Sequence, residues 1–296
     1  MNAPLPGPAW LFCPADRPDR YAKALAAADM VIIDLEDAVS PAHKASAREA
    51  LANAQLDPAR VVVRINAVSS SEHAADVAAL RRTPFRTMML AKTESPDQLE
   101  HLSGWDVVVL LETPRGIAHA HPIAASPGVV GVMWGAEDLI AALGGRSSRH
   151  SDGGYRDVAR HARSVALLAA GAYGRAAIDA VYIAIDDVTG LAREADDAVA
   201  SGFTHKACIH PSQTQVVRQA FRPTPEEVSW ARRVIEATAT GGVTSIDGRM
   251  IDSPLILQAE RVLAAPDHGA GLSSAEPRGR HADRKQTEHP PTRSTR

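Results

Sequence analysis

Residues 30–39 read MVIIDLEDAV, an apolar run that ends in the acids Glu36 and Asp37. Three further apolar runs also end in charged or polar side chains: VVVRIN at 61–66, VVVLLE at 107–112 and VVGVMWGAED at 129–138. A parallel barrel brings the C-terminal ends of all its strands to one face, so polar residues at those ends converge on one pocket. The pattern therefore predicts a fold and a functional site together.

Short runs rich in β-forming residues alternate with alanine-rich helical stretches, which is typical of βα units and a parallel sheet. We expect eight strands, at Trp10–Cys13, Met30–Leu35, Val61–Ile65, Thr87–Leu90, Val107–Leu111, Val129–Trp134, Ala180–Ile183 and Lys206–Ile209. Many of these runs are apolar at consecutive positions, as in strands that are buried on both faces. The sequence therefore predicts a closed (β/α)8 TIM barrel, with an open doubly wound sheet as the alternative.

Helix starts can be recognised from capping residues. Ser95-Pro96-Asp97-Gln98 offers an N-cap, a proline in the first turn and a glutamine at N3. Thr224-Pro225-Glu226-Glu227 has the same arrangement and predicts a helix to about Ala239. Asp247-Gly248 lies between apolar residues and predicts a hairpin turn, which a last helix from Leu255 to about Leu263 follows. We expect a C-terminal helix–hairpin–helix extension of the barrel.

The composition indicates one large domain and excludes several classes of protein. With 296 residues and 45% hydrophobic content, residues 1–265 can form one catalytic barrel domain with its extension. Residues 266–296 have almost no apolar side chains, which predicts a disordered tail. A net charge of −3 and only 4% aromatic residues argue against nucleic acid as a partner.

Location can be argued from two further features of the sequence. No apolar run approaches the length of about 20 residues that spans a bilayer, so we expect no membrane association. The two cysteines lie inside apolar runs and suggest no disulfide framework. That pattern fits a cytoplasmic protein.

Glu112 and Asp138 each come just after a predicted strand, in neighbouring units of the barrel. Two hard oxygen ligands at adjacent strand ends can hold one Mg²⁺, which completes its shell with water and substrate oxygens. The alternative is that both acids form salt bridges at the mouth of the barrel.

Arg64 follows an apolar run and is expected to point into the barrel mouth, where a buried arginine needs an anionic partner. That partner is either a substrate carboxylate or enolate oxygen, or an internal acid such as Glu36 or Asp37. Asp34 shares a strand face with Glu36 and lies deeper, so we expect it to be structural.

Three more segments have both a functional and a structural interpretation. The small residues Gly135 and Ala136 would let backbone N–H groups bind a carboxylate, or they simply form a tight turn. The Gly- and Ser-rich stretch from Leu143 to Tyr155 would serve as a lid or as a plain connector. A cationic cluster after the first strand would bind phosphates or remain solvated: Arg17, Arg20 and Lys23.

Seven motifs, in order and suitably spaced, resemble the HpcH/HpaI aldolase and citrate lyase β-subunit family, in its stand-alone citrate-lyase-β-like branch. They are LFCPADRPDRYAKA, VIIDLEDAVSPAHKASAR, VVRIN, LAKTES, LLETPRG, WGAEDL and CIHPSQ. The resemblance extends from about Trp10 to about Leu263. It implies a (β/α)8 barrel, typically trimeric, that binds Mg²⁺ and cleaves or forms the bond between an acyl-thioester and an α-keto acid.

The resemblance also implies residue roles. Glu112 and Asp138 would be the Mg²⁺ ligands, with Glu112 also at the substrate. Arg64 would contact the keto-acid carbonyl or enolate, and the backbone at Gly135 and Ala136 would hold the substrate carboxylate. Asp252 would be the catalytic acid/base, supplied across a subunit interface. The remaining assignments are Glu36 and Asp37 beside the site and Arg17, Arg20 and Lys23 at the phosphates of coenzyme A.

The expected activity is a lyase that converts a β-hydroxyacyl-CoA, of malyl-CoA, citramalyl-CoA or citryl-CoA type, into an acyl-CoA and an α-keto acid. Two alternatives share the same residues. One is a thioesterase or malate-synthase-like reaction. The other is a non-catalytic role as a metal- and CoA-binding regulatory relative, or a role as the β subunit of a citrate lyase complex.

Overall fold

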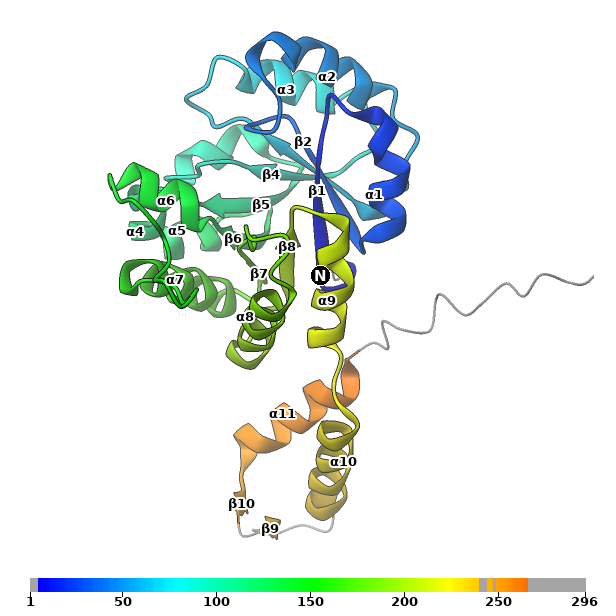
Figure 1. Cartoon of the computed structure of the whole chain (residues 1–296), viewed down its shortest axis with the longest axis vertical. Helices are drawn as coiled ribbons and strands as arrows, with labels where there is room; N and C mark the ends of the chain where they lie inside the picture. Colours follow the sequence, from blue (N-terminus) through cyan, green and yellow to red (C-terminus); the bar gives the residue numbers. More distant parts are fainter. Residues whose placement is uncertain (1–4, 240–243, 247–248, 266–296) are drawn as a thin grey trace, which may run out of the picture. The chain divides into compact units, whose positions relative to one another are not determined.

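The structure is a computed structural model that describes residues 5–239, 244–246 and 249–265. Eight parallel strands close into a barrel in sequence order (Figure 1). The strands are β1 (Ala9–Pro14), β2 (Met30–Asp34), β3 (Val61–Ile65), β4 (Thr87–Leu90), β5 (Asp106–Leu111), β6 (Val129–Trp134), β7 (Ala176–Asp179) and β8 (His205–Cys208). β8 pairs with β1, with Ala207 opposite Trp10. The predicted TIM barrel is therefore confirmed and the open sheet is excluded.

Helices connect successive strands of the barrel (Figure 1). The α-helices are α1 (Tyr21–Ala27), α2 (Lys44–Ala52), α3 (His73–Leu80), α4 (Pro114–Ala118), α5 (Ala120–Ala125), α6 (Ala136–Ala142), α7 (Asp157–Ala172), α8 (Val188–Ser201) and α9 (Pro211–Phe221). Short 3-10 helices are η1 (Pro18–Arg20), η2 (Pro41–His43), η3 (Pro58–Arg60) and η4 (Pro96–Leu102). The segment that begins at Pro96 is thus a 3-10 helix, and Ser95 makes no side-chain cap.

The seventh strand differs from the prediction. β7 covers Ala176–Asp179, whereas Ala180–Ile183 lies in the loop that follows it. The sequence AVYI looks more like a strand because it is richer in β-branched and aromatic residues. AAID forms the strand instead, paired with β6 and β8, and its fully buried Asp179 is neutralised by Lys206 and Arg163. β8 begins at His205, one residue earlier than predicted, and ends at Cys208.

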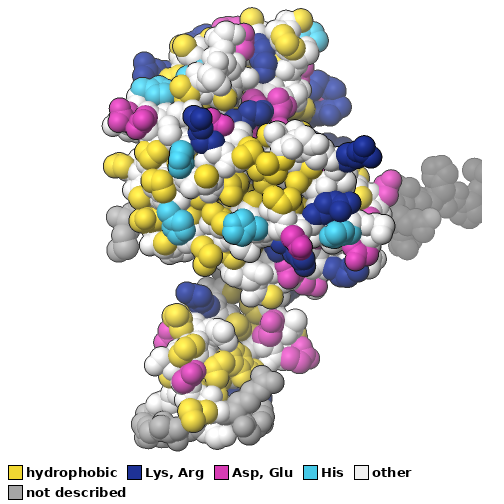
Figure 2. Space-filling model, turned by 90° about the vertical axis from the view of Figure 1, so that its left-hand side faces the viewer, with side chains coloured by type: hydrophobic (Ala, Val, Ile, Leu, Met, Phe, Trp, Pro, Cys, Tyr) yellow, Lys and Arg dark blue, Asp and Glu magenta, His cyan; other side chains and the backbone are white. Residues whose placement is uncertain are grey.

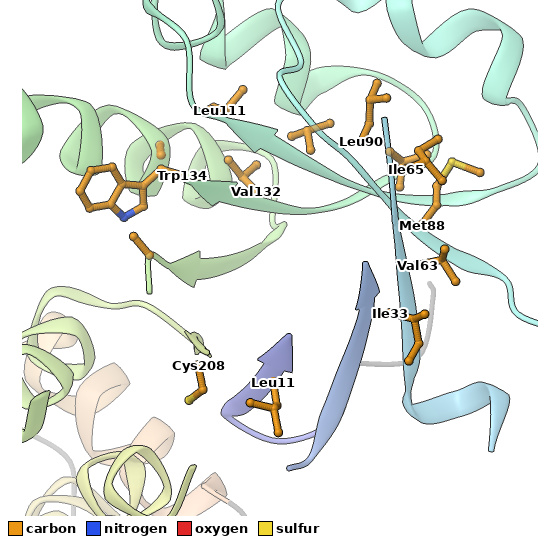
Figure 3. Packing of buried hydrophobic residues seen from close by; sticks show 14 of the residues in the cluster. Leu11, Ile33, Val63, Ile65, Met88, Leu90, Leu111, Val132, Trp134 and Cys208 are labelled. Carbon is orange, nitrogen blue, oxygen red and sulfur yellow. The ribbon is translucent and has the colours of Figure 1, made fainter. Parts of the chain in front are cut away.

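Alternation along the strands divides the core into two layers. Trp10, Ile32 and Val62 belong to one cluster of buried side chains, whereas Leu11, Ile33 and Val63 belong to another. Successive strand residues point to opposite faces, so one cluster fills the barrel and the other lies between strands and helices. Figure 3 shows residues of the second cluster. Each fully buried Leu, Ile or Val contributes roughly 1.5–3 kcal/mol to the hydrophobic term.

The chain after the barrel forms the predicted helix–hairpin–helix. It consists of α10 (Pro225–Ala239), β9 (Thr244–Ile246), β10 (Arg249–Ile251) and α11 (Ser253–Ala264). Thr224 and Glu227 form the expected capping box at the start of α10. The two strands are antiparallel, and Ala231, Val234, Ile251 and Ala259 form a buried cluster of their own.

Two predictions fall on residues that the structure does not describe. The turn at Asp247-Gly248 and the tail at 266–296 lie outside the described residues. Among the helices that are described, none is long and apolar enough to cross a membrane.

Candidate active site

Strand alternation determines which polar residues face the barrel interior. Asp34 follows Met30 and Ile32 at intervals of two along β2, and Arg64 follows Val62 along β3. Glu112 continues the interior series of Val108 and Leu110 one residue beyond β5. These three charged side chains are therefore directed to the inner face at the C-terminal ends of their strands.

Arg64 is held by two acids of the β2 end. Its Nε and Nη2 donate to Oδ1 and Oδ2 of Asp34 at 2.7 and 2.6 Å, a bidentate geometry. Its Nη1 lies 3.1 Å from Oε2 of Glu36, and its guanidinium stands 4.9 Å from the ring centroid of Phe12. Burial alone would lower the pKa of Arg64, but the charge of Asp34 raises it well above the usual value. The internal ion pair therefore exists, mainly with the deeper Asp34.

The loop after β2 is fixed by a buried lysine. Nζ of Lys44 donates to the carbonyl oxygens of Leu35 and Glu36 at 2.6 and 2.7 Å and to Oδ1 of Asn66 at 3.1 Å. Asp34 also accepts the backbone N–H of Glu36 at 2.8 Å. Glu36 is buried, whereas the side chain of Asp37 is 61% exposed. The two adjacent acids thus have different surroundings.

Lys92, after β4, joins the predicted residues into one cluster. Its Nζ contacts Oε1 of Glu36, lies 3.1 Å from Oδ2 of Asp37 and 3.8 Å from Oδ1 of Asp138. Its backbone N–H donates to Oε1 of Glu112 at 3.0 Å. Its φ is +50°, in the left-handed region that non-glycine residues seldom adopt. Lys92 was not selected from the sequence, although it lies just beyond the end of strand β4, where a polar residue would face the same pocket.

Glu112 is a buried carboxylate whose negative charge is only partly offset by the nearby cations Arg64 and Lys92. It is 2% exposed, and burial together with the charge of Asp138 raises its pKa to about 8. Gly135 leaves the space that this side chain uses, since a Cβ there would lie 2.8 Å from Cβ and 2.9 Å from Oε2 of Glu112. The close approach explains the need for glycine at this position.

The donor set at Glu112 and Asp138 fits a Mg²⁺ ion. Both side chains are carboxylates. Burial and the charge of Asp138 raise the pKa of Glu112, whereas the charges of Arg64 and Lys92 lower it. Within the described residues, no group of three or more His, Cys, Asp or Glu side chains is placed to hold a metal. A two-carboxylate site suits Mg²⁺, which keeps its other positions for water and substrate oxygens.

The segment between α6 and α7 is fastened to the barrel. Arg149 Nη1 lies 2.5 Å from Oε2 of Glu194 on α8, and Ser148 Oγ donates to Oε1 of Glu137 at 2.6 Å. Glu194 also accepts from Lys206 Nζ at 3.0 Å. These contacts favour the interpretation of 143–155 as a connector rather than a lid.

The remaining candidates lie apart from the cluster or are involved in local structure. Arg17, Arg20 and Lys23 are exposed, and Arg17 pairs with Asp19. Asp252 is exposed and caps α11, accepting the Leu255 N–H at 3.3 Å. The Gly135 N–H donates to the carbonyl of Leu111 at 3.1 Å, and Ala136 begins α6.

Comparisons with known proteins identify relatives over most of the chain. The family model of HpcH/HpaI aldolase/citrate lyase matches residues 9–211. A citrate lyase subunit beta-like protein of Mycobacterium tuberculosis is 56% identical over 264 residues, covering 89% of this chain and 97% of that protein. The mitochondrial citramalyl-CoA lyase of Homo sapiens is 32% identical, over 79% of this chain and 78% of that protein.

Among solved structures, the protein CitE from Mycobacterium tuberculosis in complex with magnesium, acetoacetate and coenzyme A is similar, with a TM-score of 0.85. It is 56% identical in sequence, and the match covers 87% of this chain and 97% of that chain.

Proposed function

Because the chain belongs to the HpcH/HpaI aldolase/citrate lyase family, we propose that it is a Mg²⁺-dependent carbon–carbon lyase acting on a β-hydroxyacyl-CoA. The products are an acyl-CoA and an α-keto acid. The observation that carries this proposal is the pair Glu112 and Asp138 at neighbouring strand ends, in a relative of proteins that bind magnesium and coenzyme A or cleave citramalyl-CoA.

Different side chains would bind the metal, stabilise the developing negative charge and transfer the proton. When bound, Mg²⁺ would polarise the oxygens of the substrate carboxylate and β-hydroxyl. Glu112 and Asp138 would hold that ion, and the free N–H groups of the Arg64 fork would stabilise the oxygen that becomes the keto-acid carbonyl. The β-hydroxyl would give its proton to solvent as its oxygen becomes the keto-acid carbonyl, and the electron pair of the broken Cα–Cβ bond would pass to the acyl-CoA as an enolate. Asp252 would deliver a proton to the enolate carbon, which completes the acyl-CoA product.

The other predicted residues bind or support. The backbone at Gly135 and Ala136 would hold the substrate carboxylate, mainly through the N–H of Ala136 at the start of α6, because the Gly135 N–H already donates to Leu111. Arg17, Arg20 and Lys23 would meet the phosphates of coenzyme A, with Arg20 and Lys23 exposed and Arg17 drawn toward Asp19. Glu36 and Asp37 would keep Arg64 and Lys92 in place.

The proposal is tested with a panel of malyl-CoA, citramalyl-CoA and citryl-CoA thioesters in the presence of Mg²⁺. We expect an acyl-CoA and an α-keto acid in equal amounts, and no turnover when a chelator removes the metal. Release of free CoA without a keto acid would instead indicate a thioesterase. Co-purification of partner subunits, with activity only in their presence, would indicate a β subunit of a citrate lyase complex.

We also propose a homotrimer in which Asp252 acts on the site of a neighbouring subunit. Figure 2, seen from the side where Figure 1 labels α4, α6 and α7, shows hydrophobic side chains at the centre of that face. On and beside α7, Val158, Leu168 and Tyr173 are 46, 65 and 42% exposed. Apolar exposure of this kind supports a protein interface.

The trimer predicts that two inactive variants rescue each other. Asp252→Asn and Glu112→Gln should each be inactive alone, whereas random mixed trimers should have roughly a quarter of their sites complete. Activity is measured after co-expression of the two chains. A matched pair, Glu112→Gln with Asp138→Asn, should show no rescue because both ligands belong to one subunit. Absence of rescue in the first pair would argue that Asp252 does not act across an interface.

We further infer a cytoplasmic location. Cys13 and Cys208 are both buried free thiols, as expected in a reducing compartment.

A further inference from the structure

The cluster at the barrel mouth holds more negative than positive charge. Four carboxylates, from Glu36, Asp37, Glu112 and Asp138, surround Lys92 and Arg64. Arg64 is engaged by Asp34 and Glu36 on the β2 side. Lys92 is therefore the cation that faces both the β2 loop and Asp138.

Lys92 is anchored at two points. Its backbone N–H donates to Oε1 of Glu112 at 3.0 Å, and its Nζ contacts Glu36 and lies 3.1 Å from Asp37. The left-handed φ of +50° lets the N–H and the ammonium serve these separate partners. Left-handed backbone is unfavourable for a non-glycine residue, so the surrounding contacts must hold it there.

Glu36 and Asp37 are further carboxylates near a metal site at Glu112 and Asp138, because Lys92 contacts all but Glu112 through its ammonium. With both acids held by Lys92, no third carboxylate among the described residues is placed beside Glu112 and Asp138 to hold a metal. An acid released from Lys92 would be able to supply one, and it would then occupy a position that the substrate needs. The ammonium of Lys92 occupies both acids and stands 3.8 Å from Oδ1 of Asp138. A fixed positive charge this close to a ligand also weakens binding of a divalent cation, since charges repel over several ångströms at a half-buried site.

We propose that Lys92 is a positioning residue that keeps the metal site two-liganded and its affinity for divalent cations moderate. The inference rests on the proposed function, because it assumes that Glu112 and Asp138 hold the metal. Lys92 acts through the carboxylates. Its backbone N–H orients the side chain of Glu112, and its ammonium keeps Glu36 and Asp37 away from the metal. The coordination positions that remain are then available to the two oxygens of the substrate.

The test is a Mn²⁺ titration of the metal-free full-length protein, with free Mn²⁺ followed by electron paramagnetic resonance. Lys92→Asn removes the charge, and asparagine tolerates the left-handed backbone. We expect Lys92→Asn to bind Mn²⁺ roughly tenfold more tightly than the wild type, because a nearby like charge is lost. Lys92→Arg keeps the charge and should bind Mn²⁺ within about threefold of the wild type. Lys92→Gly should behave like Lys92→Asn and covers the case in which asparagine impairs folding.

The expected kinetic signature is a change in KM that exceeds the change in kcat. Lys92→Asn should raise the KM for the acyl-CoA substrate, because extra carboxylate ligands on the metal compete with that substrate. Lys92→Arg should return the KM most of the way to the wild-type value. Arg160→Asn, which removes an exposed positive charge on α7, is the matched control for general electrostatics.

Three results would overturn the inference. They are an unchanged or weaker Mn²⁺ affinity in Lys92→Asn, the same tightening in Lys92→Arg, and the same tightening in Arg160→Asn. Failure of the wild type to bind Mn²⁺ at all, or binding that persists in Glu112→Gln, would contradict the metal site itself. The two failures are therefore distinguishable.

Discussion

Glu112→Gln should lower kcat/KM by about a thousandfold or more and abolish Mg²⁺ binding at the site. The amide retains the size of the carboxylate and can still meet the N–H of Lys92, so the loss isolates the charge. Binding is measured by calorimetry and turnover by keto-acid formation. Glu100→Gln, at an exposed position of η4, is the control and should leave both unchanged. Full activity in Glu112→Gln would remove this residue from the metal site.

The same substitution has a pH signature in metal-free buffer. Burial raises the pKa of Glu112 to about 8, so below that pH the folded protein holds a proton that the unfolded chain has already lost. The stability contributed by this group is therefore fully present below the ordinary pKa of glutamate and is lost as pH rises toward 8. Glutamine does not titrate, so Glu112→Gln should gain stability relative to the wild type, by up to a few kcal/mol, between pH 5 and pH 8.5. Urea unfolding with a chelator present measures the difference, and added Mg²⁺ should stabilise only the wild type.

Arg64→Met should reduce the free energy of unfolding by about 3–5 kcal/mol, because it leaves buried acids without their partner. Asp34 is fully buried and Glu36 nearly so, and Arg64 is the cation bound to both. The variant should also lose its turnover, since it removes the guanidinium that bridges these acids at the site. Urea unfolding at pH 7 gives the first value and keto-acid formation the second.

The matched control is Arg82→Met. Arg82 and Glu49 form an ion pair whose side chains are 55 and 61% exposed, so its loss should cost less than about 1 kcal/mol. Similar losses for the two arginines would mean that burial of Asp34 is not the source of the effect. Arg64→Lys should recover part of the stability but not the bidentate geometry.

Most of the barrel could be predicted, because its strands are apolar on both faces and end in polar residues. The seventh strand could not, since the buried Asp179 in AAID is compensated by Lys206, Arg163 and Trp134, which lie elsewhere in the sequence. Propensity favours the neighbouring AVYI segment, and no local signal reveals the neutralising charges. Tertiary pairing determined this strand.

The part of the candidate site that lies at the C-terminal ends of strands could be predicted from the sequence. Alternation places Asp34, Arg64 and Glu112 on one face, and this follows from the sequence alone. Lys92 was not predictable, since its importance comes from an unusual φ and from contact with Glu36, 56 residues away. The roles assigned to all the site residues stay predictions, including the metal ligands Glu112 and Asp138, the acid/base Asp252 and the cations after β1.

The chain of buried charges from Asp179 through Lys206 and Glu194 to Arg149 limits how this protein can diverge. Each member neutralises the next, so a change at one position leaves an uncompensated charge on its neighbour. New substrate preferences are therefore hard to reach through the β7 and β8 half, just as they are at the β2 and β4 ends, where Arg64 and Lys92 link buried acids in the same way. Redesign of that half requires simultaneous replacement of the linked residues, with the whole set exchanged for a well-packed apolar one.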